Sequence, residues 1–527
     1  MLSPERNNFS LWGAIKKYWV QVYFFIIFTL LFLVYLPSFF DPLRSDYLPL
    51  FYFFHHLNDL PGAVKWLHLL NYDPLNQVNF YPLTHVIMYL EYLVFGSWSF
   101  YYHLLHFAMY CVSLILIYKL ARKLFRADRL LTMMLITLFA FLFSHFDLII
   151  WSYHVHIIFS FNLLLAGFIL YLEFLKTGKM ALLVWVITLF LLPLLCYLPF
   201  IFWPVGIIFL AWLDIPVKGS RISWQKKMKS ILLVLGVVYA ICLAVFLFTR
   251  AIGTYDRPLV YLKSIFFLRD HTRAFLSVPF NTIYNGVVVN LLPFLAWPLK
   301  TCENIELGGW LEVHVDEIVR LILAGGGASL LIFIAVPAVF FYRKKRYLGK
   351  VSIFLLFLLF SEFFVLSRLC LMVNHPQYVL QQFRYQYVVN AVVILTVLLI
   401  LNNVLGGLRK GKIITGCVLA VILGMNMYYS VRGAAYVNSE LAPLKKIVYS
   451  IKKKIASGQI NAENKIYIDD KITKALSPLC WNDYMGTRYM KHTYQWMFAS
   501  KEVGYFTFSA DDAKWVVDAE NLALIKK

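Results

Sequence analysis

The chain has 527 residues, of which 61% are hydrophobic and 15% are charged, with a mean hydropathy of +0.69. Soluble domains carry about 25% charged residues, so this composition excludes a soluble globular protein. The formal net charge of +21 would suit a nucleic-acid partner, but the basic residues cluster between apolar runs, so we expect no nucleic acid. The sequence therefore predicts an all-α polytopic membrane protein.

About eleven apolar runs have the length of roughly 20 residues that a transmembrane helix needs. The run at 180–213 is interrupted by Pro193, Pro199 and Pro204, and it is long enough for one overlong helix or for two spans. We favour two spans, because a single span would place the basic loop at 343–346 outside. The predicted spans are residues 18–38, 99–120, 130–150, 155–175, 180–195, 197–213, 229–249, 317–342, 351–372, 386–405 and 412–430.

The positions of Lys and Arg predict the orientation, because short cytoplasmic loops are enriched in both residues. The loops that face the other way hold far fewer basic residues, although they are longer in total. We therefore predict a cytoplasmic N-terminus and an extracytoplasmic C-terminus. The basic segments are the N-terminal residues and the loops at 119–129, 176–179, 218–229, 343–350 and 409–412.

The last part of the chain changes in character. Residues 431–527 are polar and charged, and they contain short alternating runs at Lys465-Ile-Tyr-Ile-Asp469 and Lys514-Trp-Val-Val-Asp518. We predict a small extracytoplasmic α+β domain here, following a transmembrane domain at 1–430. A domain of this size is marginally stable alone, so we expect it to rest on the membrane part.

The loop at 41–98 is too polar to span lipid and too apolar to lie free in water, so we expect short helices along the membrane surface. A carboxylate there, partly shielded from water, can act as a general base, and Asp41 and Asp46 are the candidates. In the alternative interpretation, Asp41 starts a turn with Pro42 and Asp46 caps a helix. The acids and histidines grouped in this loop are Asp41, Asp46, His55, His56, Asp59, Asp73 and His85.

Two further outward-facing stretches carry candidate residues. His145 and Asp147, at the end of the third predicted span, can hold a divalent cation or orient a phosphate, or they can belong to an interfacial cap. Arg384, followed by Tyr385, stands at the mouth of the tenth span, where a guanidinium is costly unless it meets an anion such as a lipid phosphate. The alternative is an Arg that snorkels and anchors the span. Arg269, in the long outer loop, is a second candidate for the phosphate.

Several short strings together resemble the N-terminal half of the GT-C glycosyltransferases. Within that superfamily the chain is most similar to the tetratricopeptide-linked transmembrane O-mannosyltransferases and their bacterial relatives, although it shows no such repeats. Tyr81 stands where those proteins have an Arg, and their acidic pair is not contiguous here. The strings are Phe80-Tyr-Pro-Leu-Thr84, Tyr89-Leu-Glu-Tyr-Leu-Val-Phe-Gly96, Tyr102-His-Leu-Leu-His106, Lys119-Leu-Ala-Arg122 and Arg384-Tyr-Gln-Tyr387.

The resemblance implies a GT-C-like fold in a bacterial inner membrane. It also implies transfer, with inversion, of a sugar from a polyprenyl-phosphate donor to a glycan, lipid or protein hydroxyl on the extracytoplasmic side. Asp46 is the better match to the base and Asp41 the alternative, while Asp147 would bind a divalent cation if one is needed. The alternatives are a translocator of lipid-linked sugars and an inactive scaffold. The residues implied in substrate binding are Arg384, Tyr385, His145, His103 and Arg269.

Overall fold

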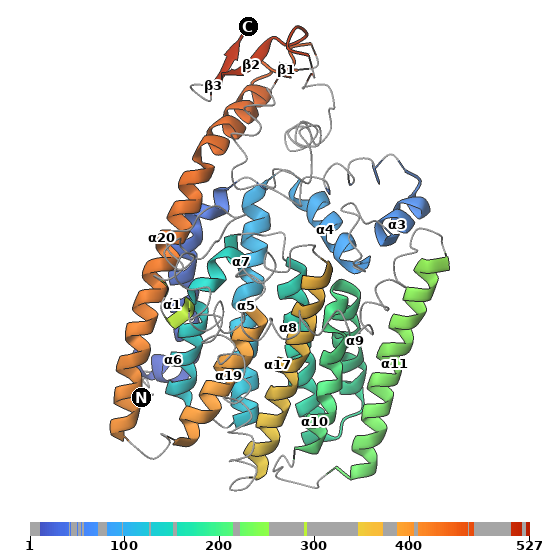
Figure 1. The fold of residues 1–527 in the computed structure, drawn as a ribbon, viewed down its shortest axis with the longest axis vertical. Helices are drawn as coiled ribbons and strands as arrows, with labels where there is room; N and C mark the ends of the chain where they lie inside the picture. The colour runs from blue at the N-terminus through green and yellow to red at the C-terminus, as the bar shows by residue number, and fades with distance from the viewer. Residues whose placement is uncertain are drawn as a thin grey trace, which may run out of the picture.

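The protein is mostly helical, and its long helices run roughly parallel to one another in a bundle (Figure 1). Most of the buried apolar side chains belong to one continuous core between these helices. The computed structural model describes residues 11–41, 43, 50, 54, 57–58, 60–71, 82–96, 98–125, 128–150, 155–213, 222–251, 289–291, 293, 346–372, 387–404, 409–461, 463–467, 507, 509–518 and 523–527.

The helices follow the apolar runs of the sequence. Each predicted span is helical except residues 317–342, which lie outside the described residues, so the total of about eleven spans stays a prediction. The helices are α1 (Leu11–Tyr35), α3 (Gly62–Asn71), α4 (Pro82–Phe95), α5 (Ser99–Phe125), α6 (Arg129–Ala140), α7 (Phe146–Ile150), α8 (Val155–Thr177), α9 (Ala181–Cys196), α10 (Gly206–Trp212), α11 (Trp224–Ala251), α14 (Val289–Leu291), α17 (Arg346–Met372), α19 (Tyr387–Val404) and α20 (Arg409–Ala456), with 3-10 helices η1 (Leu36–Phe40), η2 (Phe143–His145) and η4 (Leu198–Val205).

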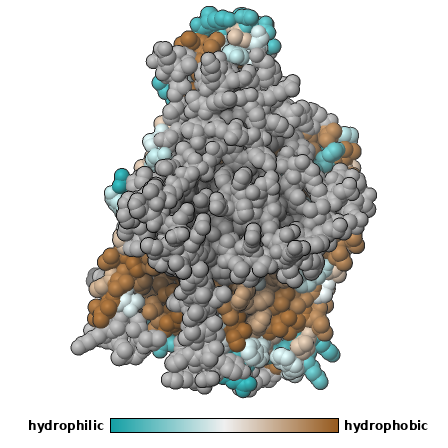
Figure 2. All heavy atoms as spheres, in the orientation of Figure 1, coloured by the Kyte–Doolittle hydropathy of each residue, from teal (hydrophilic) through white to brown (hydrophobic). Residues whose placement is uncertain are grey.

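Five helices in the described part of the chain are long and apolar enough to cross a membrane, which makes this a multi-pass membrane protein. A sixth crossing is obtained if α6 and α7, which are bent by 53°, count as one broken span. In Figure 2 brown, hydrophobic residues lie on both sides of the lower half, with hydrophilic residues at the bottom edge and at the top. The five helices are Tyr18–Phe40, Ser99–Phe125, Val155–Thr177, Trp224–Phe248 and Ile413–Tyr436.

The run at 180–213 forms two helical segments, and whether each crosses the membrane stays a prediction. Adjacent lysines of α11 contact the beginning of the first segment and the end of the second: Lys226 Nζ donates to the Gly178 carbonyl at 3.1 Å, and Lys227 Nζ donates to the Ala211 carbonyl at 3.0 Å. The chain therefore reverses near Tyr197, between α9 and η4. We call the end of the bundle that holds these lysines the basic end, and the opposite end the loop end.

The third predicted span, in contrast, is broken where no Pro or Gly stands. Between α6 and η2 the backbone leaves the helical hydrogen-bond pattern, which would leave polar groups unpaired in a membrane. Two distant amides satisfy them: Asn426 Oδ1 accepts from the Phe143 N–H at 2.8 Å, and Asn290 Oδ1 accepts from the Ser144 N–H at 3.1 Å. The break is thus held by α14 and α20.

Helix α20 is the longest element, with 48 residues, or about 70 Å at 1.5 Å per residue. Its span ends at Tyr436, and the remaining residues extend about 30 Å beyond it at the loop end (Figure 1). The predicted boundary at residue 430 therefore falls inside a continuous helix.

A small sheet lies at the far end of α20 (Figure 1). Its strand order is β1-β2-β3, with β1 parallel and β3 antiparallel to β2, so that Trp515 pairs with Ile466 on one side and with Lys526 on the other. Trp515 fixes the sheet to the helix, because Lys454 Nζ lies 4.0 Å from its ring centroid. The strands are β1 (Ile466–Tyr467), β2 (Trp515–Asp518) and β3 (Ala523–Lys526), and the first two lie in the alternating runs.

Candidate active site at the loop end

The loop end has its own apolar cluster, separate from the bundle core. Aromatic rings form its centre: Phe54 lies 5.4 Å from Tyr89 and 5.7 Å from Tyr92, measured between ring centroids. The cluster joins the segment after α1 to α4 and to the start of α5, so this part of the chain is folded against the bundle. Its buried members are Leu43, Leu50, Phe54, Leu57, Leu69, Met88, Tyr89, Tyr92, Tyr102 and Val155.

Hydrogen bonds fix the orientation of these helices. Tyr89 donates to Asn58 Oδ1 at 2.7 Å, and Tyr102 of α5 donates to the Gly96 carbonyl at 2.9 Å. Gly96 ends α4 with a φ of 55°, a conformation that favours glycine. Thr84 donates to the carbonyl of Cys196 at 2.6 Å, which places the first turn of α4 over the end of α9.

Asp41 follows η1 and forms an ion pair with α20. Its carboxylate is fully buried and lies 2.5 Å from Lys445 Nζ, whose side chain is 17% exposed. Lys445 also contacts the side chain of Asn438 and donates to the Pro37 carbonyl at 3.4 Å. One lysine on α20 therefore holds both η1, at the end of the first span, and the carboxylate at the start of the outer loop.

His103, in the second turn of α5, borders the same segment. Its ring is stacked on Phe39 of η1, with the centroids 6.5 Å apart and the planes 4° from parallel. The side chain is 3% exposed. His103 and Asp41 thus flank η1, and the structure brings these two candidates to one neighbourhood.

Glu91, on α4, is a buried acid that is not among the candidate residues predicted from the sequence. It is 6% exposed, and neither of its carboxylate oxygens has a hydrogen-bond partner among the described residues. Burial raises the pKa of Glu91 to about 8 and lowers the pKa of His85, on the same helix, to about 4. The Glu91 carboxyl is therefore protonated below about pH 8. The feature of the sequence that could have pointed to Glu91 is that it is the single acid in a helix made mostly of aromatic and aliphatic residues.

His145 lies inside the bundle at the bend between α6 and α7. It is fully buried, and its two ring nitrogens contact the Tyr110 hydroxyl at 2.9 Å and the Asn390 side-chain amide at 3.1 Å. Because protein groups occupy both nitrogens, we expect His145 to hold the bend rather than to bind a phosphate. Asp147 is in the first turn of α7, but its side chain is outside the description.

The remaining candidates lie outside the described residues: Asp46, Arg269, Arg384 and Tyr385. In the described part of the chain, no three His, Cys, Asp or Glu side chains gather in a group that could hold a metal ion. The described side chains therefore do not show where the predicted divalent cation would bind.

Comparison with solved structures gives only weak likeness. The chain is similar to the crystal structure of ArnT from Cupriavidus metallidurans bound to undecaprenyl phosphate, with a TM-score of 0.45 and 11% sequence identity over 94% of this chain and 86% of that chain. No family model and no curated protein matches. A likeness of this strength assigns neither a fold family nor a substrate.

Proposed function

We propose that this protein is an integral membrane glycosyltransferase that transfers a sugar from a polyprenyl-phosphate donor to an acceptor hydroxyl at the loop end, with inversion. The observation that carries the proposal is the anchored start of the outer loop, where the ion pair between Asp41 and Lys445 and the aromatic cluster around Phe54 hold an acidic segment against the bundle. The motif resemblance supplies the reaction class. Active sites need such support, because a loosely held base loses its orientation.

In this proposal the two outer acids have different roles. Asp41 is a positioning residue, because its carboxylate is buried and paired with a lysine and cannot reach an acceptor. Asp46, five residues further on, is the general base. It takes the proton of the acceptor hydroxyl while that oxygen bonds to the anomeric carbon and the bond from this carbon to the phosphate oxygen breaks.

The leaving phosphate stays on the lipid and carries the developing negative charge. Arg384 with Tyr385 is proposed to bind it, and Arg269 to assist, because a guanidinium forms strong paired hydrogen bonds with phosphate oxygens. His103 is proposed to support this site through its stacking on Phe39, beside Asp41.

The test is a transfer assay with purified full-length protein, a panel of polyprenyl-phosphate monosaccharides and a mixture of glycan and lipid acceptors. Asp46→Asn should reduce the rate of product formation by about 10²- to 10⁴-fold, which is the usual contribution of a general base. The matched control is Asp511→Asn, because the Asp511 side chain is 98% exposed and lies in the turn before β2, on the distant sheet's side of α20. Its rate should equal that of the wild type.

Two outcomes would contradict the proposal. Equal rates for Asp46→Asn and the wild type would remove Asp46 from the role of base. Movement of the sugar lipid across vesicles, without a glycosidic product for any donor, would identify a translocator instead.

A further inference from the structure

The predicted outer loop at 250–316 does not lie wholly outside the bundle. Its turn α14 lies beside α20, between the two ends of the bundle (Figure 1). There the carbonyl of Asn290 accepts from Asn426 Nδ2 at 2.5 Å, and Asn290 is 4% exposed. Asn426 lies about 15 Å along α20 from Tyr436, where the span of that helix ends. The turn is therefore at the depth of the membrane interior.

The residues around α14 agree with a segment that enters the membrane without crossing it. Residues 287–297 are apolar except for Asn290, and this run is about half the length that a span needs. Pro293 follows the turn, and a proline interrupts the helical hydrogen-bond pattern. Such a short apolar segment is typical of a re-entrant loop, which enters the membrane and leaves it on the same side.

The side chain of Asn290 contacts the break between α6 and η2. Its Oδ1 accepts from the Ser144 N–H at 3.1 Å, and its Nδ2 donates to Ser144 Oγ at 3.0 Å. The same hydroxyl oxygen accepts from Asn390 Nδ2 of α19 at 2.9 Å. Ser144 is fully buried, and Asn390 is 1% exposed. One serine therefore joins the outer loop to the broken span and to α19.

The loop and the break stabilise each other. The Ser144 N–H loses its helical partner at the break, and an unpaired backbone group is strongly unfavourable inside a membrane. Asn290 in turn depends on the serine, because a buried amide side chain is costly without hydrogen-bond partners. Removing either side chain should therefore release the other.

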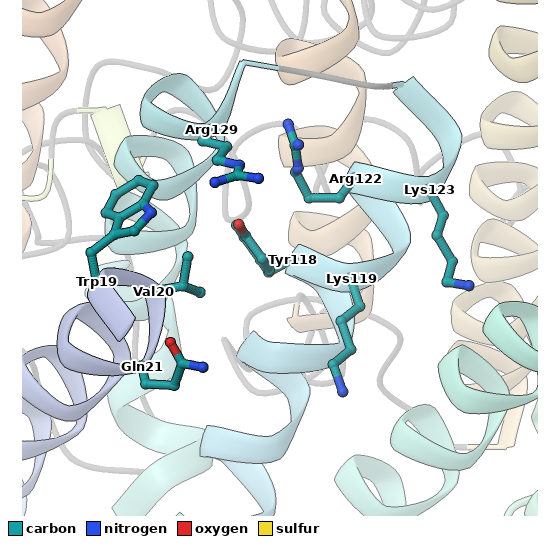
Figure 3. Close-up of a pocket in the computed structure, with 8 residues that line it drawn as sticks. All are labelled: Trp19, Val20, Gln21, Tyr118, Lys119, Arg122, Lys123 and Arg129. Carbon is teal, nitrogen blue, oxygen red and sulfur yellow. The ribbon is translucent and has the colours of Figure 1, made fainter. Parts of the chain in front are cut away.

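The start of α6 is held without the outer loop. The N–H of Asp128, which precedes α6, donates to Asn402 Oδ1 at 2.9 Å. Arg129, the first residue of α6, lines a cleft of about 440 Å³ at the basic end together with Tyr118 of α5 (Figure 3). Loss of the Asn290 contacts should therefore affect the break and spare the start of α6.

We propose that the predicted outer loop at 250–316 is a re-entrant loop, and that Asn290 is the positioning residue that anchors it to the break at Ser144. The anchor fixes the loop to the bundle at a point between its two ends. This is the loop that carries Arg269, so the anchor contributes to binding of the donor phosphate. That contribution rests on the proposed function, whereas the re-entry and the anchor do not.

The first test is hydrogen–deuterium exchange of the purified full-length protein in lipid nanodiscs, read by mass spectrometry. In Asn290→Leu the amides of residues 143–145 and 289–291 should exchange about tenfold faster, because one buried hydrogen bond contributes about that factor to local opening. Amides at the start of α6 should exchange as in the wild type.

The matched control is Asn162→Leu. The buried Asn162 also makes two side-chain hydrogen bonds within the bundle, to Ser113 at 2.6 Å and to the Met109 carbonyl at 2.8 Å, but it does not contact α14. Exchange at the break should be unchanged in this variant. Equal acceleration in both variants would indicate general loosening of the bundle, and unchanged exchange in Asn290→Leu would show that Asn290 is not the anchor.

The second test determines the side on which the segment leaves the membrane. Cys302 and a second reporter, Lys300→Cys, should react with a membrane-impermeant maleimide from the same side of sealed vesicles as a reference cysteine, Asp511→Cys, whose position is 98% exposed beyond the loop end. Reaction from the opposite side would mean that the segment crosses the membrane. Reaction only after denaturation would mean that the segment does not emerge, and either result would overturn the re-entry.

The third measurement separates the anchor from catalysis. In the transfer assay, Asn290→Leu should raise the KM for the lipid donor about tenfold and change kcat by less than about twofold, because a positioning residue alters how often the loop is correctly placed. A reduced kcat with an unchanged KM would contradict a role in donor binding. Absence of product from the wild type would contradict the proposed function instead, while the exchange and labelling results would still decide the re-entry.

Discussion

The two ends of the bundle use charged side chains in opposite ways. At the basic end, two lysines of α11 donate to carbonyl groups at the ends of helices, as Lys226 does to Gly178 at 3.1 Å and Lys227 does to Ala211 at 3.0 Å. These bonds satisfy groups that a helix leaves unpaired, and the cation complements the negative end of the helix dipole. At the loop end, Asp41 and Glu91 are buried instead.

The difference shows that the contribution of one charged side chain to stability depends on how deeply it is buried. The exposed Lys226 keeps water as an alternative partner, so its contact contributes little by itself. A buried carboxylate has lost its water and depends on one partner or on a proton. We therefore expect single substitutions to have large effects at the buried charges of the loop end and small ones at exposed lysines of the basic end.

The largest effect is expected for the ion pair that anchors the outer loop. Lys445→Met leaves the Asp41 carboxylate buried without its cation and should lower the free energy of unfolding by about 3–5 kcal/mol. Combining it with Asp41→Leu should restore most of the loss, because neither charge is then left unpaired. Unfolding of the purified protein in denaturant measures both.

The control for this prediction is the neighbouring Lys446, which is exposed on the same helix. Lys446→Met should change the free energy of unfolding by no more than about 0.5 kcal/mol. If Lys445→Met were as mild as Lys446→Met, the ion pair would not anchor the loop.

A smaller, pH-dependent effect is expected at Glu91. The pKa of its carboxyl is raised to about 8 in the folded protein, from 4.5. Between these values the folded state holds a proton that the unfolded state has released, so stability should fall as the pH rises, by at most about 1.4 kcal/mol per pH unit. Below 4.5 both states are protonated and above 8 both are ionised, so the dependence should end at these limits.

The measurement is the melting temperature between pH 5 and 9. Glu91→Gln cannot ionise and should lose this part of the pH dependence, while Glu463→Gln, at an exposed position, should keep the dependence of the wild type. Identical profiles for Glu91→Gln and the wild type would mean that Glu91 is not the group responsible.

The smallest effect is expected at the basic end. Lys226→Met removes an exposed cation and its bond to the Gly178 carbonyl after α8, and it should cost about 0.3–1 kcal/mol. Chemical unfolding compares it with Lys445→Met under the same conditions. Equal losses for the two variants would remove the distinction between the ends.

The elements that the sequence predicted well depend on local properties. Apolar runs of about 20 residues predicted the spans, since a bilayer selects length and hydropathy along one segment. The prolines and the distribution of basic residues together predicted the reversal near Tyr197, which the contacts of Lys226 and Lys227 confirm. The strands β1 and β2 also lie where side chains alternate between polar and apolar.

The break after α6 could not be predicted in the same way. Residues 130–150 read as one span, because the groups that allow the break, Asn290 and Asn426, are about 150 and 280 residues away in the chain. A hydropathy pattern indicates a continuous helix, because unpaired backbone groups are costly in a membrane, but it does not reveal a distant side chain that can pair with those groups. The same reason applies to His145, whose partners on α5 and α19 could not be predicted from its own neighbourhood in the sequence.

The sequence by itself determined that this protein lies in a membrane, which segments are apolar enough to form its helices, and which loops carry acids or cations, because each of these follows from neighbouring residues. Only the tertiary structure decided which charges are buried and what compensates them. Asp41 became an anchored ion pair, Glu91 a protonatable buried acid, and the cations at the end of α5 and the start of α6 the lining of a cleft. Each outcome depends on side chains from helices far apart in sequence, because burial and electrostatic partners are set by packing.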